Sequence, residues 1–127
     1  MTGGAALLPD GENREVYAAG LPVELLAAPA EETIAGEPRY GSRVLGQTPA
    51  GELGVWELRG GTVSDVEVDE VFVVLSGNAT IEFLDEDRAV TIGAGDVMRL
   101  TAGSRTRWTV ADHLRKVYLA WDGPDSP

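Results

Sequence analysis

The sequence of 127 residues contains no cysteine and a single histidine, His113. The absence of cysteine excludes disulfides, thiolate metal ligands, cysteine nucleophiles and redox switching. One imidazole cannot form a His–His metal site within one chain. The sequence also lacks a G-x-S-x-G elbow, a P-loop and a dinucleotide-binding glycine fingerprint, and His113 has no recognised spacing to a serine triad. Any chemistry must therefore come from carboxylate, hydroxyl, basic and aromatic side chains.

Long apolar runs and excess positive charge are missing as well. No segment approaches the ~20 apolar residues of a membrane span. The first ten residues have neither the basic residue nor the long apolar stretch of a signal peptide. The net charge of −11 disfavours nucleic acid and anionic membranes as partners. We therefore expect a soluble, cytoplasmic protein.

Between Ala50 and Gly123 there is no proline, and short apolar segments alternate with glycine-containing breaks. No helical period is long enough for a crossover helix. Such spacing is typical of an antiparallel sandwich or barrel. Ser76-Gly77-Asn78 is expected to form a tight hairpin turn. The predicted strands are 55–58, 62–68, 71–75, 79–84, 89–92, 97–100, 106–110 and 115–121.

The chain divides into three parts by composition. Residues 1–22 are rich in alanine, glycine and proline and predict a loose or extended N-terminal arm. Residues 23–122 form the folded domain, and residues 123–127 are a C-terminal tail. Within the domain, residues 23–28 predict one strand or one helical turn, and residues 31–40 a loop or short strand.

Two spaced patterns resemble the cupin superfamily. Glu70, followed after six residues by Gly77, is similar to the end of the first cupin motif. Gly95-Asp96 and residues 101–103 are similar to the second motif without its proline. More narrowly, the chain resembles small single-domain cupins of the (S)-ureidoglycine aminohydrolase-like and ethanolamine-utilisation-like branch. The resemblance implies an all-β, double-stranded β-helix, the RmlC-like jelly roll, with an interior pocket. It also implies a homodimer.

In metal-binding members of that superfamily, three histidines and a glutamate converge on one ion. The resemblance places the two first-motif histidines at Ser64 and Val66, or at Val63 and Asp65 with a longer spacing. It places the second-motif histidine at Thr106. Only Glu70 keeps a ligating side chain, and one carboxylate does not hold a transition metal. An oxygen-only site would need Asp65, Glu67 and Asp69, which alternation does not bring together with Glu70. We expect no metal and no cofactor.

Strand alternation indicates which side chains face the pocket. If Glu70 faces inward, Phe72 and Val74 share its face, and an inward Thr106 carries Trp108 with it. For Glu70 we expect a hydrogen bond to Thr106, Ser64, Tyr118 or an indole N–H. Whether Lys116 and Tyr118 or Arg115 and Val117 face inward stays open. The candidate ligand-binding residues are Ser64, Val66, Phe72, Thr106, Trp108, Trp56 and Lys116, although core filling suits Trp56 better than ligand binding does.

Two functions fit these residues. The first is a metal-free cupin that binds a small molecule in an aromatic, largely apolar pocket. The second is an isomerase, lyase or hydrolase, similar to ureidoglycine aminohydrolase. It would use Glu70 as general acid or base, with Tyr118 as a possible catalytic partner, or a non-standard metal site.

Overall fold

A computed structural model describes residues 6–122, so residues 1–5 of the predicted arm and the predicted tail lie outside the description. The elements are the 3₁₀ helix η1 (Ala18–Gly20) and strands β1 (Leu26–Ala27), β2 (Thr33–Thr48), β3 (Gly51–Val66), β4 (Asp69–Phe83), β5 (Arg88–Gly93), β6 (Val97–Leu100) and β7 (Arg105–Trp121). Within this part of the chain, no helix has the length and apolarity needed to cross a bilayer.

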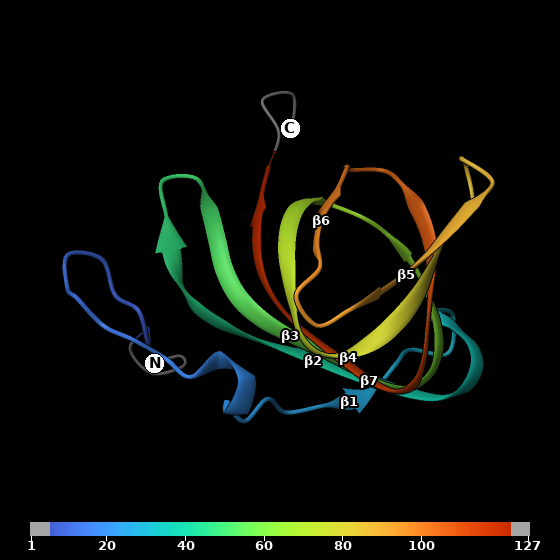
Figure 1. Ribbon diagram of the computed structural model, residues 1–127, viewed down its shortest axis with the longest axis horizontal. Helices are drawn as coiled ribbons and strands as arrows, with labels where there is room; N and C mark the ends of the chain where they lie inside the picture. The colour runs from blue at the N-terminus through green and yellow to red at the C-terminus, as the bar shows by residue number, and fades with distance from the viewer. Residues whose placement is uncertain (1–5, 123–127) are drawn as a thin grey trace.

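The long strands pair in the order β1-β2-β3-β7-β4-β5, and β6 pairs with β4. All of these pairings are antiparallel. One half of β4 pairs with β6 and the other half with β5. Each long strand thus passes from one layer of the barrel to the other, as its curved ribbon shows (Figure 1). The predicted all-β jelly roll is confirmed.

Several predicted turns are instead bends inside long strands. Gly60-Gly61 lies within β3, Ser76-Gly77-Asn78 within β4 and residues 111–113 within β7, so the predicted hairpin at Ser76-Gly77-Asn78 is wrong. The pairing register shifts at these levels, between Arg59 and Gly61 and between Gly77 and Thr80. Such shifts are β-bulges, which bend a strand without ending it. A glycine with positive φ serves a bulge as well as a turn, which explains the error.

A substitution at Gly77 tests whether the bend in β4 requires a glycine. Gly77 has φ +77°, and a Cβ there would collide with the carbonyl oxygen of His113 on β7. Gly77→Ala should therefore lower the free energy of unfolding by about 3 kcal/mol, from left-handed strain plus overpacking. Gly95→Ala is the matched control because Gly95 has φ +93° with no heavy atom nearby, and it should lose only about 1 kcal/mol. Equal losses in urea unfolding would contradict this account.

The N-terminal segment is held against the outside of the barrel. The backbone N–H of Leu8 donates to the carbonyl of Leu45 on β2. Arg115 on β7 donates from Nη1 to the carbonyls of Ala18 and Leu21, at 2.9 and 2.6 Å. Residues 31–40, predicted as loop or short strand, belong mostly to β2, and Pro38 sits at a register shift where no ladder bond is lost.

The core lies between the two layers of the barrel. Alternate residues of β4 are buried, which places Glu70, Phe72 and Val74 on the inner face as alternation predicts. Thr106, Trp108 and Val110 of β7 are buried in the same way. Burial of these side chains supplies most of the driving force for folding. One end of this core contains the buried ion pair of Glu70 and Lys116.

Candidate functional site

A cavity of about 190 Å³ opens at one end of the barrel. At ~30 Å³ per water molecule it has room for about six waters or one small organic molecule. Strands β2, β3, β4 and β7 and the β3–β4 linker all contribute to its wall. We call it the inner cavity; its lining residues are Ser42, Trp56, Asp65, Val66, Glu67, Val68, Glu70, Trp108, Lys116 and Tyr118.

An ion pair forms the floor of the inner cavity. The Nζ atom of Lys116 lies 2.7 Å from Oε2 of Glu70, and their side chains are only 6% and 9% exposed. The register of β4 and β7 pairs Glu70 with Ala120 and Val74 with Lys116, which brings both side chains to the inner face. This settles the orientation left open by the sequence: Lys116 and Tyr118 face inward, whereas Arg115 turns to Glu57 and the N-terminal segment.

Three aromatic rings surround the Lys116 ammonium. Nζ lies 4.6, 4.4 and 4.8 Å from the ring centroids of Trp56, Phe72 and Trp108. Each face attracts a cation by ~0.5–2 kcal/mol, more when water is excluded. The indoles of Trp56 and Trp108 also contact each other edge to face at 5.4 Å. The protein thus stabilises a positive charge inside the barrel with its own aromatic side chains.

Burial disfavours the ionised form of Glu70 even with this partner. Burial raises the pKa of Glu70 above its ordinary value; the Lys116 ammonium offsets part of the rise, and the Glu67 carboxylate adds to it. Oε2 of Glu70 is buried, and the Lys116 ammonium 2.7 Å away is its partner. The protonated form of Glu70 is therefore favoured more than that of a free carboxyl group.

Glu67 is a second buried carboxylate that the sequence analysis missed. Its Oε2 accepts hydrogen bonds from Thr106 Oγ1 at 2.6 Å and from Trp108 Nε1 at 2.9 Å. We expected Thr106 or an indole N–H to donate to Glu70, and this prediction is wrong because both donate to Glu67. The chain leaves the sheet at Glu67 and Val68, where backbone bonds tie Glu67 to Gly103 and Ser104. Alternation does not extend across this break, and no sequence pattern indicated that Glu67 points inward.

Asp65 lies at the mouth of the inner cavity. Although its side chain is exposed, partial burial by the surrounding protein raises its pKa to about 6, and the neighbouring Glu67 and Glu32 carboxylates contribute. Glu32 accepts a 2.6 Å hydrogen bond from the Tyr40 hydroxyl, which raises the pKa of Tyr40 to about 12. The mouth is therefore rich in carboxylates with little positive charge to balance them.

The remaining predicted residues fall in two places. Val66, Trp56, Trp108 and Tyr118 line the inner cavity with Glu70 and Lys116. Ser64 and Thr106 line a neighbouring, more open hollow of about 490 Å³, and Val66 lines both hollows. Phe72 is buried beneath Lys116.

Tyr118 is not oriented toward Glu70. Its hydroxyl donates to Oε2 of Glu52 at 2.8 Å. Burial and this bond to Glu52 raise the pKa of Tyr118. The structure therefore gives Glu70 and Tyr118 a common cavity without a direct hydrogen bond between them.

The positions that the cupin resemblance assigns to metal ligands do not suit a divalent ion. Val66 has no lone pair, and the hydroxyl of Thr106 donates to Glu67. Glu70 faces an ammonium group at 2.7 Å. Across residues 6–122, no three His, Asp or Glu side chains converge as metal ligands. Transition metals need three or four converging N or O donors, and this donor set does not fit them.

A hydrogen-bonded chain of Ser76, His113 and Asp112 lies away from the residues of the inner cavity. His113 Nε2 is 3.0 Å from Ser76 Oγ, and Nδ1 is 2.6 Å from Asp112 Oδ2. Sequence spacing had not suggested this arrangement. The Asp112 side chain is 81% exposed, so its charge is screened by water rather than focused on the imidazole. We interpret these hydrogen bonds as a structural link between β4 and β7.

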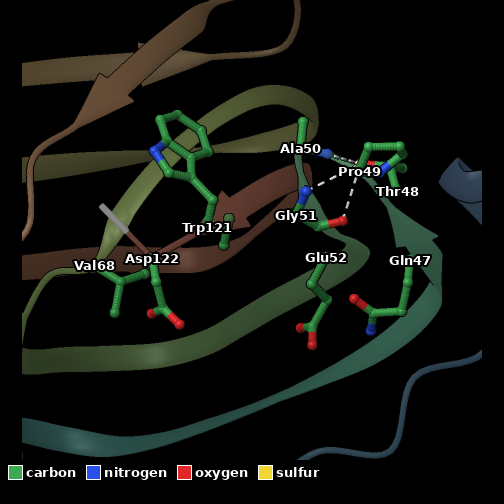
Figure 2. A pocket seen from close by; sticks show the side chains of 10 residues that line it. Gln47, Thr48, Pro49, Ala50, Gly51, Glu52, Val68, Trp121 and Asp122 are labelled. Atoms are coloured by element: carbon green, nitrogen blue, oxygen red, sulfur yellow. Dashed lines mark hydrogen bonds between the residues drawn. The ribbon is translucent and has the colours of Figure 1, made fainter. Parts of the chain in front are cut away.

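Another hollow, of about 510 Å³, lies beside the β2–β3 hairpin (Figure 2). Thr48 Oγ1 accepts hydrogen bonds from Ala50 and Gly51 and so holds the turn on one side. Trp121 and Asp122 stand on the other side. Among residues 6–122, no ion pair lies in its wall, in contrast to the inner cavity. Volume alone therefore does not make it the candidate site.

Comparison with known proteins agrees with the fold. The EutQ protein of Clostridium difficile superposes with a TM-score of 0.66 at 17% identity, over 87% of each chain. A cupin superfamily protein from Desulfitobacterium hafniense DCB-2 gives 0.62 at 15% identity, over 94% of this chain and all of that one (100%). A cupin-2 domain containing protein from Shewanella frigidimarina NCIMB 400 gives 0.53 at 21%, over 61% of this chain and 76% of that one. At these identities the likeness shows the fold alone.

Sequence comparison then gives the family. No curated protein matches the chain. The model of the EutQ-like cupin domain matches residues 45–118, which include the buried pair Glu70 and Lys116 and the indoles of Trp56 and Trp108. This match extends over more than half of the chain, and the chain belongs to the EutQ-like cupin domain family.

Proposed function

We propose that this cupin binds a small organic molecule in the inner cavity without a metal ion. The observation that carries the proposal is the Lys116 ammonium, 2.7 Å from Glu70 and enclosed by three aromatic rings. In this arrangement the chain supplies its own cation to the inward glutamate. Apolar and aromatic walls with a few converging polar groups are typical of small-molecule sites.

A soak of crystals with small fragments tests this function. The fragments should be neutral, cationic and anionic compounds of a few heavy atoms, applied to protein treated with EDTA. We expect electron density for a fragment in the inner cavity, against Trp56, Trp108 and Asp65. Fragments found only outside the inner cavity, or bound there only after a divalent ion is restored, would refute the proposal.

Proton transfer by Glu70 is the second candidate, an isomerase, lyase or hydrolase activity. It is supported by the raised pKa of Glu70 and by the burial of its side chain. A carboxyl group with a raised pKa holds its proton more firmly, which favours a role as general acid or base. The Lys116 ammonium already faces Oε2 of Glu70, which favours binding over catalysis as the main proposal.

Hydrogen exchange in D2O distinguishes the two. If Glu70 is a general base, a bound fragment with a C–H next to a carbonyl should exchange that proton, and Glu70→Gln should abolish the exchange. The matched control is Glu82→Gln, which changes an exposed carboxylate on the same strand. No exchange with wild-type protein, despite binding, would leave binding as the function.

A further inference from the structure

We propose that the ligand of the inner cavity is a small organic cation, an alkylammonium compound. This inference rests on the proposed function and adds the ligand's charge. The cavity wall carries the carboxylates Asp65, Glu67 and Glu70, and Lys116 is the one basic residue lining it. Because Glu70 and Lys116 neutralise each other, the charges of Asp65 and Glu67 remain to attract a cation.

Buried oxygen atoms face the same space. Glu67 and Glu70 are each more than nine-tenths buried. Oε2 of Glu67 accepts hydrogen bonds from Thr106 and Trp108, and within residues 6–122 Oε1 is not among the buried atoms without a partner, so water or a ligand can reach it. Oε2 of Glu70 faces the Lys116 ammonium at 2.7 Å. A ligand that covers these oxygens removes their hydrogen bonds to water, which is costly unless the ligand supplies donors of its own. An ammonium group carries up to three N–H donors and no acceptor, so it meets this need.

Aromatic faces continue beyond the inner cavity. A second hollow, of about 230 Å³, shares Trp56, Trp108 and Asp65 with it and adds Tyr40 and Glu32. The rings of Tyr40 and Trp56 are 6.1 Å apart. No basic residue lines this second hollow. Lys116 already shows that these indoles hold an ammonium on one side. An alkylammonium at the shared mouth would contact the same rings and Asp65, with its alkyl chain against the apolar wall.

Three compounds of equal chain length test the charge: n-butylammonium, 1-butanol and butyrate, measured by isothermal titration calorimetry. We expect n-butylammonium to bind most tightly, about tenfold more than 1-butanol, and butyrate least. Equal affinity of n-butylammonium and 1-butanol would overturn the cation proposal and leave the proposed function intact. Failure of all three, with no fragment in the cavity, would overturn both. Tighter binding of Ca²⁺ than of n-butylammonium would identify an inorganic cation site instead.

Glu67→Gln is the variant that tests the residues. Its amide oxygen can still accept from Thr106 and Trp108, so folding should be retained while the charge is lost. We expect about a tenfold loss of affinity for n-butylammonium and little change for 1-butanol. Glu82→Gln, with the same change of net charge on an exposed side chain, should change neither. Equal losses in the two variants would mean that only overall charge matters, against the proposal.

Proton competition gives an independent readout. The groups around Asp65 are the carboxylates of Glu32 and Glu67, the ammonium of Lys116 and the backbone N–H of Val66. A cation prefers the ionised carboxylate, so the affinity should rise as the pH increases through about 6 and level off above it. In Asp65→Asn this rise should be reduced. An unchanged pH profile in that variant would contradict a role for Asp65.

Discussion

Lys116→Met should lower the free energy of unfolding by about 3–5 kcal/mol at pH 8, because it leaves the Glu70 carboxylate buried without a counter-charge. Both side chains are more than nine-tenths inaccessible to solvent, so water cannot take the place of the ammonium. Methionine keeps most of the side-chain volume among the aromatic rings, which limits the cavity contribution. Urea unfolding followed by tryptophan fluorescence measures the loss.

The pH dependence of this loss identifies its cause. The folded-state pKa of Glu70 is already raised by burial, and removing Lys116 raises it further. A carboxyl group whose pKa is raised in the folded state favours folding when it is protonated. The free energy of unfolding therefore falls as the pH rises from the pKa of the unfolded state through the pKa of the folded state. The difference between variant and wild type should therefore be smaller at pH 5 than at pH 8.

The double variant Glu70→Gln/Lys116→Met serves as the control. It removes both charges and should recover much of the lost stability, since a neutral pair needs no ionic partner. A Lys116→Met protein as stable as wild type at pH 8, or a loss independent of pH, would show that the ion pair does not have the role assigned to it.

Arg115→Met should detach the N-terminal segment from the barrel and lower the free energy of unfolding by about 3 kcal/mol. Arg115 donates to Glu57 at 2.7 Å and to two carbonyls of the segment, and it is 8% exposed. Burial raises the pKa of Glu57, but Arg115 and Arg59 outweigh this and hold it below its ordinary value. In this variant Glu57 still has Arg59 as an ion-pair partner, at 2.5 Å. The loss in the free energy of unfolding should therefore lie at the low end of the range for breaking a buried ion pair.

Limited proteolysis measures the detachment directly. Arg14 is an exposed trypsin site within this segment, and its cleavage should become faster in Arg115→Met. Arg59→Met is the control, because Arg59 is half exposed and contacts Glu57 but not the segment; it should lose at most about 1 kcal/mol and leave cleavage unchanged. Equal cleavage rates in wild type and Arg115→Met would contradict the anchoring role.

Much of the fold was predictable from local patterns. The spacing of apolar segments indicated an antiparallel barrel, and alternation placed Glu70 with Phe72 and Thr106 with Trp108 on inner faces. Strand lengths were predicted less well, because the sequence does not distinguish a glycine in a turn from a glycine in a β-bulge when both have positive φ. Gly77 is the clearest case: it bends β4 without ending it.

The site was predicted only in part, because its key contacts join distant residues. The pair of Glu70 and Lys116 depends on the register between β4 and β7, which no local pattern encodes. Glu67 points inward because the chain leaves the sheet there, so the period of the strands does not reach it. Alternation finds the face of a strand but does not find the partner across the barrel.

The most direct test of the account is a crystal structure grown with excess Mn²⁺, with data collected for anomalous scattering. The account predicts that the Lys116 ammonium remains beside Oε2 of Glu70, within the rings of Trp56, Phe72 and Trp108, with no anomalous peak in the inner cavity. A manganese peak bonded to Glu70, with Lys116 displaced from the rings, would contradict it.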